Sequence, residues 1–130
     1  MNKILLLAAL LAAGTAAIHI VAGGADIATP LLASSLATEP KLTLYAAWHM
    51  VSLILVVSAL ALALGSLPGQ VRACRAMVLF ISVLWCSFGV LFLGIAMLHP
   101  ESGGLFSLPQ WTLLLPVGLL GLWGRMKGEE

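Results

Sequence analysis

Three histidines are the side chains of this sequence best suited to chemistry, because nearly all of its other residues are apolar. His19, His49 and His99 each lie close to one end of a long apolar run. Imidazole rings bind zinc, copper and iron, hold haem between helices and relay protons near neutral pH. The sequence contains no HExxH, CxxC or CxxCH motif, so spacing alone does not choose among these chemistries.

The composition predicts a protein whose main solvent is lipid. Apolar residues make up 62% of the 130 residues and charged residues only 8%, with a mean hydropathy of +1.12. A soluble domain carries about 25% charged residues. The formal net charge of +1, without a basic patch or a phosphate-binding glycine loop, argues against a nucleic-acid partner.

Four apolar segments predict an all-α fold, an integral membrane four-helix bundle formed by a single transmembrane domain, residues 1–130. The expected spans are about residues 4–22, 42–67, 76–98 and 108–124, close to the roughly 20 residues that a bilayer core requires. The fourth segment is short and contains Pro116. It serves as a span if Pro109 occupies its first turn, where a missing N–H costs little.

The basic residues predict the orientation of these spans. Lys and Arg concentrate in cytoplasmic segments, and five of the six basic residues fall on one side if all four segments cross: Lys3, Arg72, Arg75, Arg125 and Lys127. We therefore expect a multi-pass protein of the bacterial inner membrane with both termini in the cytoplasm.

A rival topology begins with a cleaved signal peptide. Residues 1–17 combine Lys3 with a short apolar core and small residues up to Ala17. The apolar run continues to Val21, and cleavage would leave three spans, so we favour retention of the first segment.

The first outer loop carries a signal for a short helix. Thr29 is suited to cap it and Pro30 to occupy its first position. We expect an interfacial helix within residues 29–40, lying on the outer mouth of the bundle; an irregular loop is the alternative.

Small residues predict close contacts between the helices. Membrane helices approach one another where small side chains meet, and such residues recur on the first span (Ala9, Ala13, Gly14, Ala16, Ala17) and on the fourth (Gly118, Gly121, Gly124). Trp85 falls in the middle of the third span, where we expect it to be packed between helices.

This topology places all three histidines on the outer side. His19 and His49 lie roughly 6 to 9 Å below the ends of their helices, at matching depth on neighbouring antiparallel spans. We therefore expect His49 to meet His19. Together with His99, the pair is predicted to bind a transition metal (Cu, Zn or Fe) or haem.

Nearby polar residues are candidates to orient the rings, as groups around metal ligands do. Thr15 shares a helix face with His19, and Tyr45 and Ser52 share one with His49. Glu101 is close enough in sequence to join His99. The competing interpretation is that the histidines only pack or form hydrogen bonds near the interface.

The placement of a histidine late in the first span, "WH" at 48–49 and "LPQW" at 108–111 resembles small, poorly characterised four-span proteins of the bacterial inner membrane. That resemblance implies topology and location, and no activity. The small multidrug exporters, also four-span proteins, use a glutamate embedded in the first helix, whereas no Asp or Glu lies within any span here.

Three functions follow from these features. The first is the outer histidine pocket that holds a metal or haem. The second is a non-catalytic accessory or scaffold subunit of a membrane complex. The third is a proton-linked carrier of small molecules, which would require a homo-oligomer because each chain has few polar positions to line a path. An enzyme would depend on metal-bound water, and the sequence leaves its substrate and reaction open.

Overall fold

The computed structural model describes residues 1–127, and these are helical with short connections and no strand. The long helices are α1 (Lys3–Gly23), α3 (Thr38–Ser66), α5 (Arg75–Leu98) and α6 (Trp111–Lys127). Shorter segments join them: η1 (Gly24–Ala28), α2 (Thr29–Ala33), α4 (Gln70–Ala73), η2 (Pro100–Ser102) and η3 (Gly104–Phe106).

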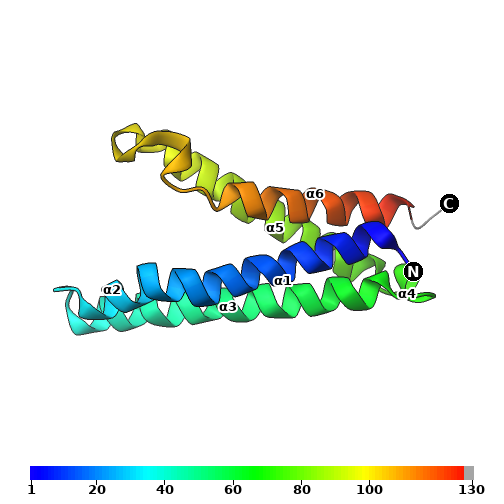
Figure 1. Ribbon diagram of the computed structural model, residues 1–130, viewed down its shortest axis with the longest axis horizontal. Helices are drawn as coiled ribbons and strands as arrows, with labels where there is room; N and C mark the ends of the chain where they lie inside the picture. Colours follow the sequence, from blue (N-terminus) through cyan, green and yellow to red (C-terminus); the bar gives the residue numbers. More distant parts are fainter. Residues whose placement is uncertain (128–130) are drawn as a thin grey trace.

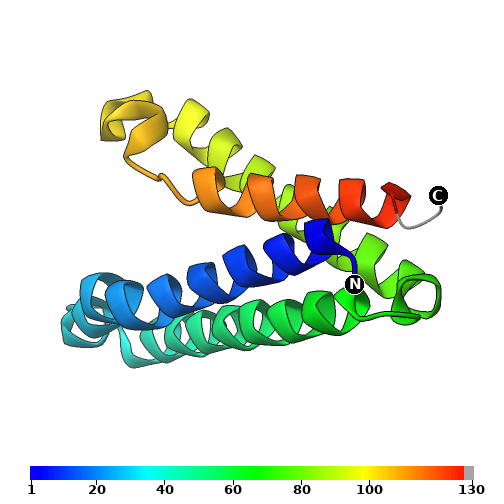
Figure 2. The ribbon, with the colours of Figure 1, turned by 45° about the vertical axis from the view of Figure 1, so that its right-hand side comes forward.

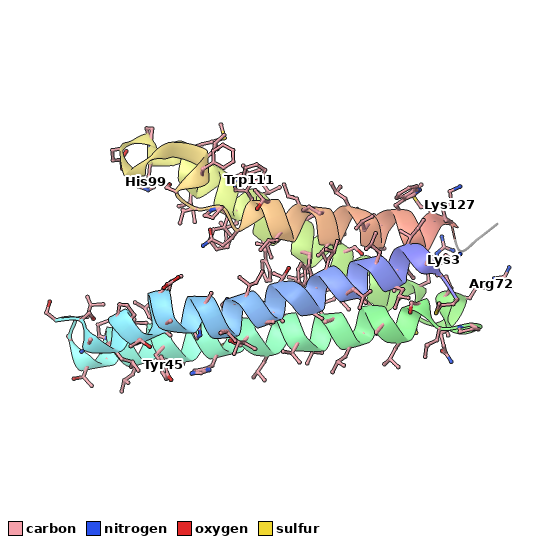
Figure 3. The ribbon with its side chains drawn as sticks, viewed as in Figure 1. Lys3, Tyr45, Arg72, His99, Trp111 and Lys127 are labelled. Carbon is pink, nitrogen blue, oxygen red and sulfur yellow. The ribbon has the colours of Figure 1, made fainter. Side chains whose placement is uncertain are left out.

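The long helices form two antiparallel pairs, α1 with α3 and α5 with α6 (Figure 1). The pairs meet near the chain termini, where α1 packs on α6, and diverge toward the opposite end, as both views show (Figures 1 and 2). We call the end that carries Lys3, Arg72 and Lys127 the basic end (Figure 3). The far end carries α2 on one pair and residues 99–110 on the other.

Within residues 1–127, three helical segments are long and apolar enough to cross a membrane: Lys3–Ala33, Thr38–Ser66 and Arg75–Leu98. The expectation of an all-helical protein with membrane-spanning helices is thereby supported. The remaining long helix, α6, has 17 residues and contains Pro116, whose side chain is exposed. It begins at Trp111 rather than at 108, so Pro109 precedes the helix instead of occupying its first turn.

Asn2 joins three helices at the basic end. Its side-chain oxygen accepts hydrogen bonds from the Ile4 and Leu5 amides, both at 3.1 Å, and so caps α1. Its side-chain nitrogen donates to the Gly124 carbonyl of α6 at 2.7 Å, and its backbone amide donates to the Ser66 carbonyl of α3 at 2.8 Å. One residue thus satisfies backbone groups that would otherwise be unpaired at helix ends.

Glycines of α6 permit the closest helix contacts, as the sequence predicts. A Cβ on Gly118 would lie 2.8 Å from backbone atoms of Ser82 and Cys86, and one on Gly121 would overlap the Ser82 side chain. A Cβ on Gly124 would lie 2.8 Å from the Leu5 side chain. The three glycines therefore set the spacing of α6 against both α5 and α1.

The core lies where the two pairs meet. Trp85 is fully buried among apolar side chains of the other helices, confirming the expectation for this residue. On α1, Ala9 and Ala16 are buried, whereas Ala13 and Ala17 are exposed. The prediction of a packing contact at Gly14 is wrong, because no atom lies within 4 Å of a Cβ built there.

The segment after α1 differs from the predicted interfacial helix. The helix of α1 continues through the π-helical η1 into α2, and it ends at Ala33. Thr29 does not cap a new helix, because its hydroxyl donates to the Gly24 carbonyl five residues earlier, at 3.0 Å. Because the turns of α2 stack directly on those before them, the segment continues along α1 (Figure 1).

The link between α5 and α6, residues 99–110, contains two single turns joined by glycines. Gly103 and Gly104 have φ values of 107° and 77°, which favour glycine. The Trp111 indole N–H donates to the Leu105 carbonyl at 2.9 Å and thereby ties this link to the start of α6.

We predict that Gly118→Ala will separate α5 from α6, because the atoms that its Cβ would meet include rigid backbone. The expected loss is about 1 to 3 kcal/mol of unfolding free energy, as for other overpacked cores. Unfolding in mixed micelles, followed by circular dichroism, measures it.

Gly14→Ala is the matched control, because it makes the same change in a helix where no atom lies within 4 Å. It is expected to be neutral or to stabilise the helix by up to about 1 kcal/mol. Equal losses for the two variants would contradict the assigned role of Gly118.

Candidate functional site

His19 packs against Trp48, the residue that precedes His49. The two rings are stacked, with centroids 3.8 Å apart and planes at 16°. His19 Nε2 also lies 3.4 Å from the Trp48 carbonyl oxygen. A carbonyl only accepts hydrogen bonds, so Nε2 is the nitrogen that donates. In the neutral imidazole, Nδ1 is then the nitrogen that keeps its lone pair.

Gly23 makes room for the Trp48 ring. It lies four residues after His19, on the same face of α1, and a Cβ at Gly23 would come within 2.5 Å of the far edge of the indole. The Ser52 hydroxyl donates to the same Trp48 carbonyl at 3.1 Å. Trp48 is therefore held through its ring by α1 and through its carbonyl by both helices. We call His19, Gly23, Trp48 and Ser52 the His–Trp clasp.

His49 lies beside Tyr45 on α3. Their rings are 4.5 Å apart at 89°, an edge-to-face contact between residues one turn apart. His49 is exposed, whereas Tyr45 and Trp48 are partly buried. Successive helical residues point about 100° apart, so the helix that directs Trp48 toward α1 turns His49 away from that direction.

His99 lies at the end of α5 and contacts Glu101. Its Nδ1 is 3.0 Å from a carboxylate oxygen of Glu101, as the sequence led us to expect, and both side chains are mostly exposed. Figure 3 places His99 at the far end of the α5–α6 pair, and Tyr45 on the α1–α3 pair. Because the pairs diverge there, His99 is separated from the aromatic residues of α3.

The hydroxyl groups of Thr15 and Ser52 hydrogen-bond backbone rather than imidazole. Thr15 donates to the Leu11 carbonyl at 2.8 Å, one turn back on its own helix, and Ser52 donates to Trp48. This intrahelical bonding is the usual solution for a hydroxyl in an apolar helix. Neither proton is thus left to orient a histidine ring.

No group of three or more His, Cys, Asp or Glu side chains within the described part of the chain is placed to hold a metal ion. The two Cys, 74 and 86, are free thiols. The donor set expected from the sequence is therefore not assembled as a group of three. Whether His19, His49 and His99 bind a metal or haem stays a prediction.

Trp48 and Gly23 are the residues of the clasp that sequence reasoning missed. Two signals were available: Trp48 has nearly the depth of His49, and Gly23 shares a helix face with His19. Tryptophan near a helix end is typical of the membrane interface, and that general expectation concealed a specific contact.

Comparison of the chain with protein-family models, with curated proteins and with solved structures gave no match.

We predict that Gly23→Ala will displace Trp48 and break its stack on His19. The expected loss is about 1 to 3 kcal/mol of unfolding free energy in the otherwise unchanged protein. In a Trp48→Ala background the loss should nearly vanish, because the clash is gone. A double-mutant cycle on unfolding in mixed micelles measures this coupling.

Gly24→Ala is the control for the cycle, since no atom lies within 4 Å of a Cβ at that position. It should show no coupling to Trp48. A Gly23→Ala loss that persists undiminished without Trp48 would refute the clasp.

Proposed function

We propose that this protein is a non-catalytic accessory or scaffold subunit of a membrane complex, in which a partner's transmembrane helix covers the far half of α1. The single observation that carries the proposal is a helix face that changes from buried to exposed. Ala8 and Ala12 are fully buried and Thr15 is 8% exposed, whereas Ala22, two turns further on along the same side, is exposed.

The change follows from the divergence of the helix pairs. The side of α1 that holds Ala8, Ala12 and Thr15 is covered toward the basic end, where α1 packs on α6. The same side continues to Ala22, seven residues after Thr15, and Ala22 is exposed. A continuous apolar face covered along half its length is a natural seat for one more helix.

His19 supports a structural role for the same region. His19 has its ring against Trp48 and its Nε2 on a backbone carbonyl, so it joins α1 to α3. This arrangement stabilises one helix pair without help from the other. A rigid pair with an uncovered face is what a scaffold requires.

The topology is part of the proposal. We infer four spans with both termini in the cytoplasm of a bacterial cell, including α6 as the fourth. In support, Lys3, Arg72 and Lys127 share one end (Figure 3), and α6 is about 25 Å long at 1.5 Å per residue, near the bilayer core thickness of about 30 Å.

Photocrosslinking in the native membrane tests the proposal. A photoreactive amino acid replaces Ala22, and a second variant carries it at Leu7, which is 48% exposed on the half of α1 toward the basic end. We expect a defined protein adduct from Ala22 and only lipid adducts from Leu7. Lipid adducts alone at Ala22 would count against an accessory subunit.

A metal or haem site is a second candidate, favoured by the lone pair that His19 keeps on Nδ1. Under this function, protein purified in detergent and supplied with Cu, Zn, Fe or haem would retain a near-stoichiometric amount. The double variant His19→Ala, His49→Ala would lose it. Elemental analysis and the absorption spectrum measure this; a colourless protein free of metal after reconstitution would eliminate the candidate.

A further inference from the structure

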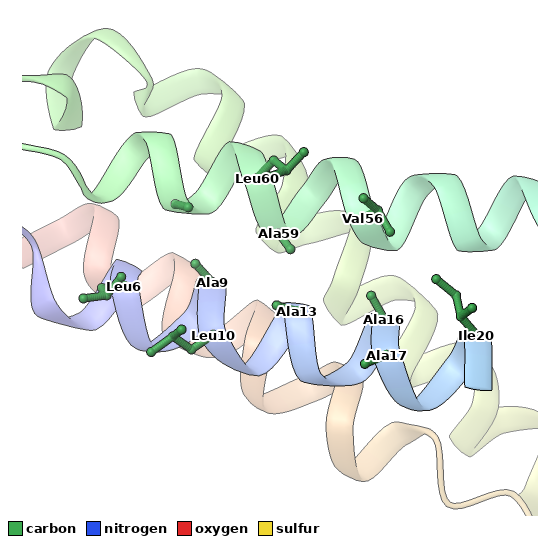
Figure 4. Close-up of a pocket in the computed structure, with 11 residues that line it drawn as sticks. Leu6, Ala9, Leu10, Ala13, Ala16, Ala17, Ile20, Val56, Ala59 and Leu60 are labelled. Atoms are coloured by element: carbon green, nitrogen blue, oxygen red, sulfur yellow. The ribbon is translucent and has the colours of Figure 1, made fainter. Parts of the chain in front are cut away.

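A shallow groove runs along one side of the α1–α3 pair (Figure 4). It is lined from Leu6 to Ile20 on α1 and from Val56 to Ala63 on α3, entirely by apolar residues. Six of the lining residues are alanines, and their methyl groups leave a hollow beside the larger side chains: Ala9, Ala13, Ala16, Ala17, Ala59 and Ala63.

The dimensions of the groove indicate what can occupy it. Its volume is about 350 Å³, and the α1 residues that line it span about 21 Å at 1.5 Å per residue. This volume lies at the lower end of the roughly 300 to 1,000 Å³ of ligand pockets. A small, elongated space with an entirely apolar lining suits one hydrocarbon chain.

The length of the groove also suits a lipid tail. Half of a bilayer core is about 15 Å thick, so a chain that enters from one leaflet can remain in the groove over its whole depth. The tail would approach from the basic end, where the groove begins at Leu6.

Lys3 supplies a charge at that entrance. It lies one turn before Leu6 on the same side of α1, and its side chain is exposed. The N-terminus of α1 adds the positive end of the helix dipole at the same place. The phosphate of an anionic lipid at this depth would be attracted by the positive potential, while its tail lay in the apolar groove. A neutral amphiphile would gain only the apolar contact with the groove.

We propose that the groove binds one acyl chain of an anionic phospholipid, with the phosphate of its head group at Lys3. The site is independent of the accessory function, because it does not include Ala22 and needs no protein partner. Tail and head are recognised by separate features, the groove and the lysine, and each can be changed without the other.

Native mass spectrometry of the full chain in mild detergent tests the site, with phosphatidylglycerol and phosphatidylcholine of the same acyl chains added at equal concentrations. We expect one phosphatidylglycerol to bind about fivefold more tightly, the factor that corresponds to about 1 kcal/mol for one lysine near an anionic surface. Lys3→Gln should abolish the preference. Ala13→Leu, which fills the groove with an exposed side chain, should weaken the binding of both lipids.

Two control variants make the same chemical changes elsewhere. Lys41→Gln removes a lysine from the start of α3 at the far end, and Ala46→Leu enlarges an exposed alanine outside the groove. Both should bind lipid like the parent protein, and circular dichroism should confirm helix content in all four variants. Equal binding of the two lipids, a preference that survives Lys3→Gln, or normal binding by Ala13→Leu would each overturn the site. A dimer that only Ala13→Leu dissociates would overturn it in favour of a second copy in the groove.

Discussion

The close approach of α6 to α5 and α1, made through Gly118, Gly121 and Gly124, is the constraint on which the rest of the arrangement depends. In a bilayer, helices gain nothing by merely burying apolar surface, because lipid tails are as apolar as leucine. Association must come from dense van der Waals contact and from hydrogen bonds. The glycines supply the first, and Asn2 supplies the second by donating to the Gly124 carbonyl.

Both contributions are concentrated toward the basic end, and the divergence of the two pairs follows from that. Gly124 meets Leu5 near the start of α1, while Gly121 and Gly118 meet Ser82 and Cys86 of α5. Beyond them, Gly89 of α5 still closely approaches Leu115 of α6, whereas Gly94 of α5 has no atom within 4 Å of a Cβ built there. With no close contact between the pairs at the far end, each must stabilise itself. The His–Trp clasp does this for α1 and α3, and the close approach of Gly89 to Leu115 does it for α5 and α6.

Composition and periodicity predicted the helical fold because those signals are local and strong: long apolar runs, few charges, and glycines repeated on one helix. The partners of individual side chains were harder to predict. His49 and Trp48 are adjacent in sequence and nearly equal in depth, so only the rotation of α3 about its axis decides which of them faces His19, and no pattern in the sequence specifies that rotation. The prediction for residues 24–33 was wrong for a related reason. Thr29 and Pro30 are suited to begin a new helix, but the same residues also fit within a helix that continues through a π turn.

The uncovered faces of this bundle differ in how strongly they indicate a binding partner. Exposure alone argues for nothing in a membrane, since lipid covers any apolar surface at little cost. Ala22 is informative because the side of α1 on which it lies is buried at Ala8 and Thr15, so the same helix shows both the covered and the uncovered state. The α1–α3 groove is informative because its lining is entirely apolar and its entrance carries a lysine. The two proposals together place a partner helix and an anionic lipid on opposite sides of α1.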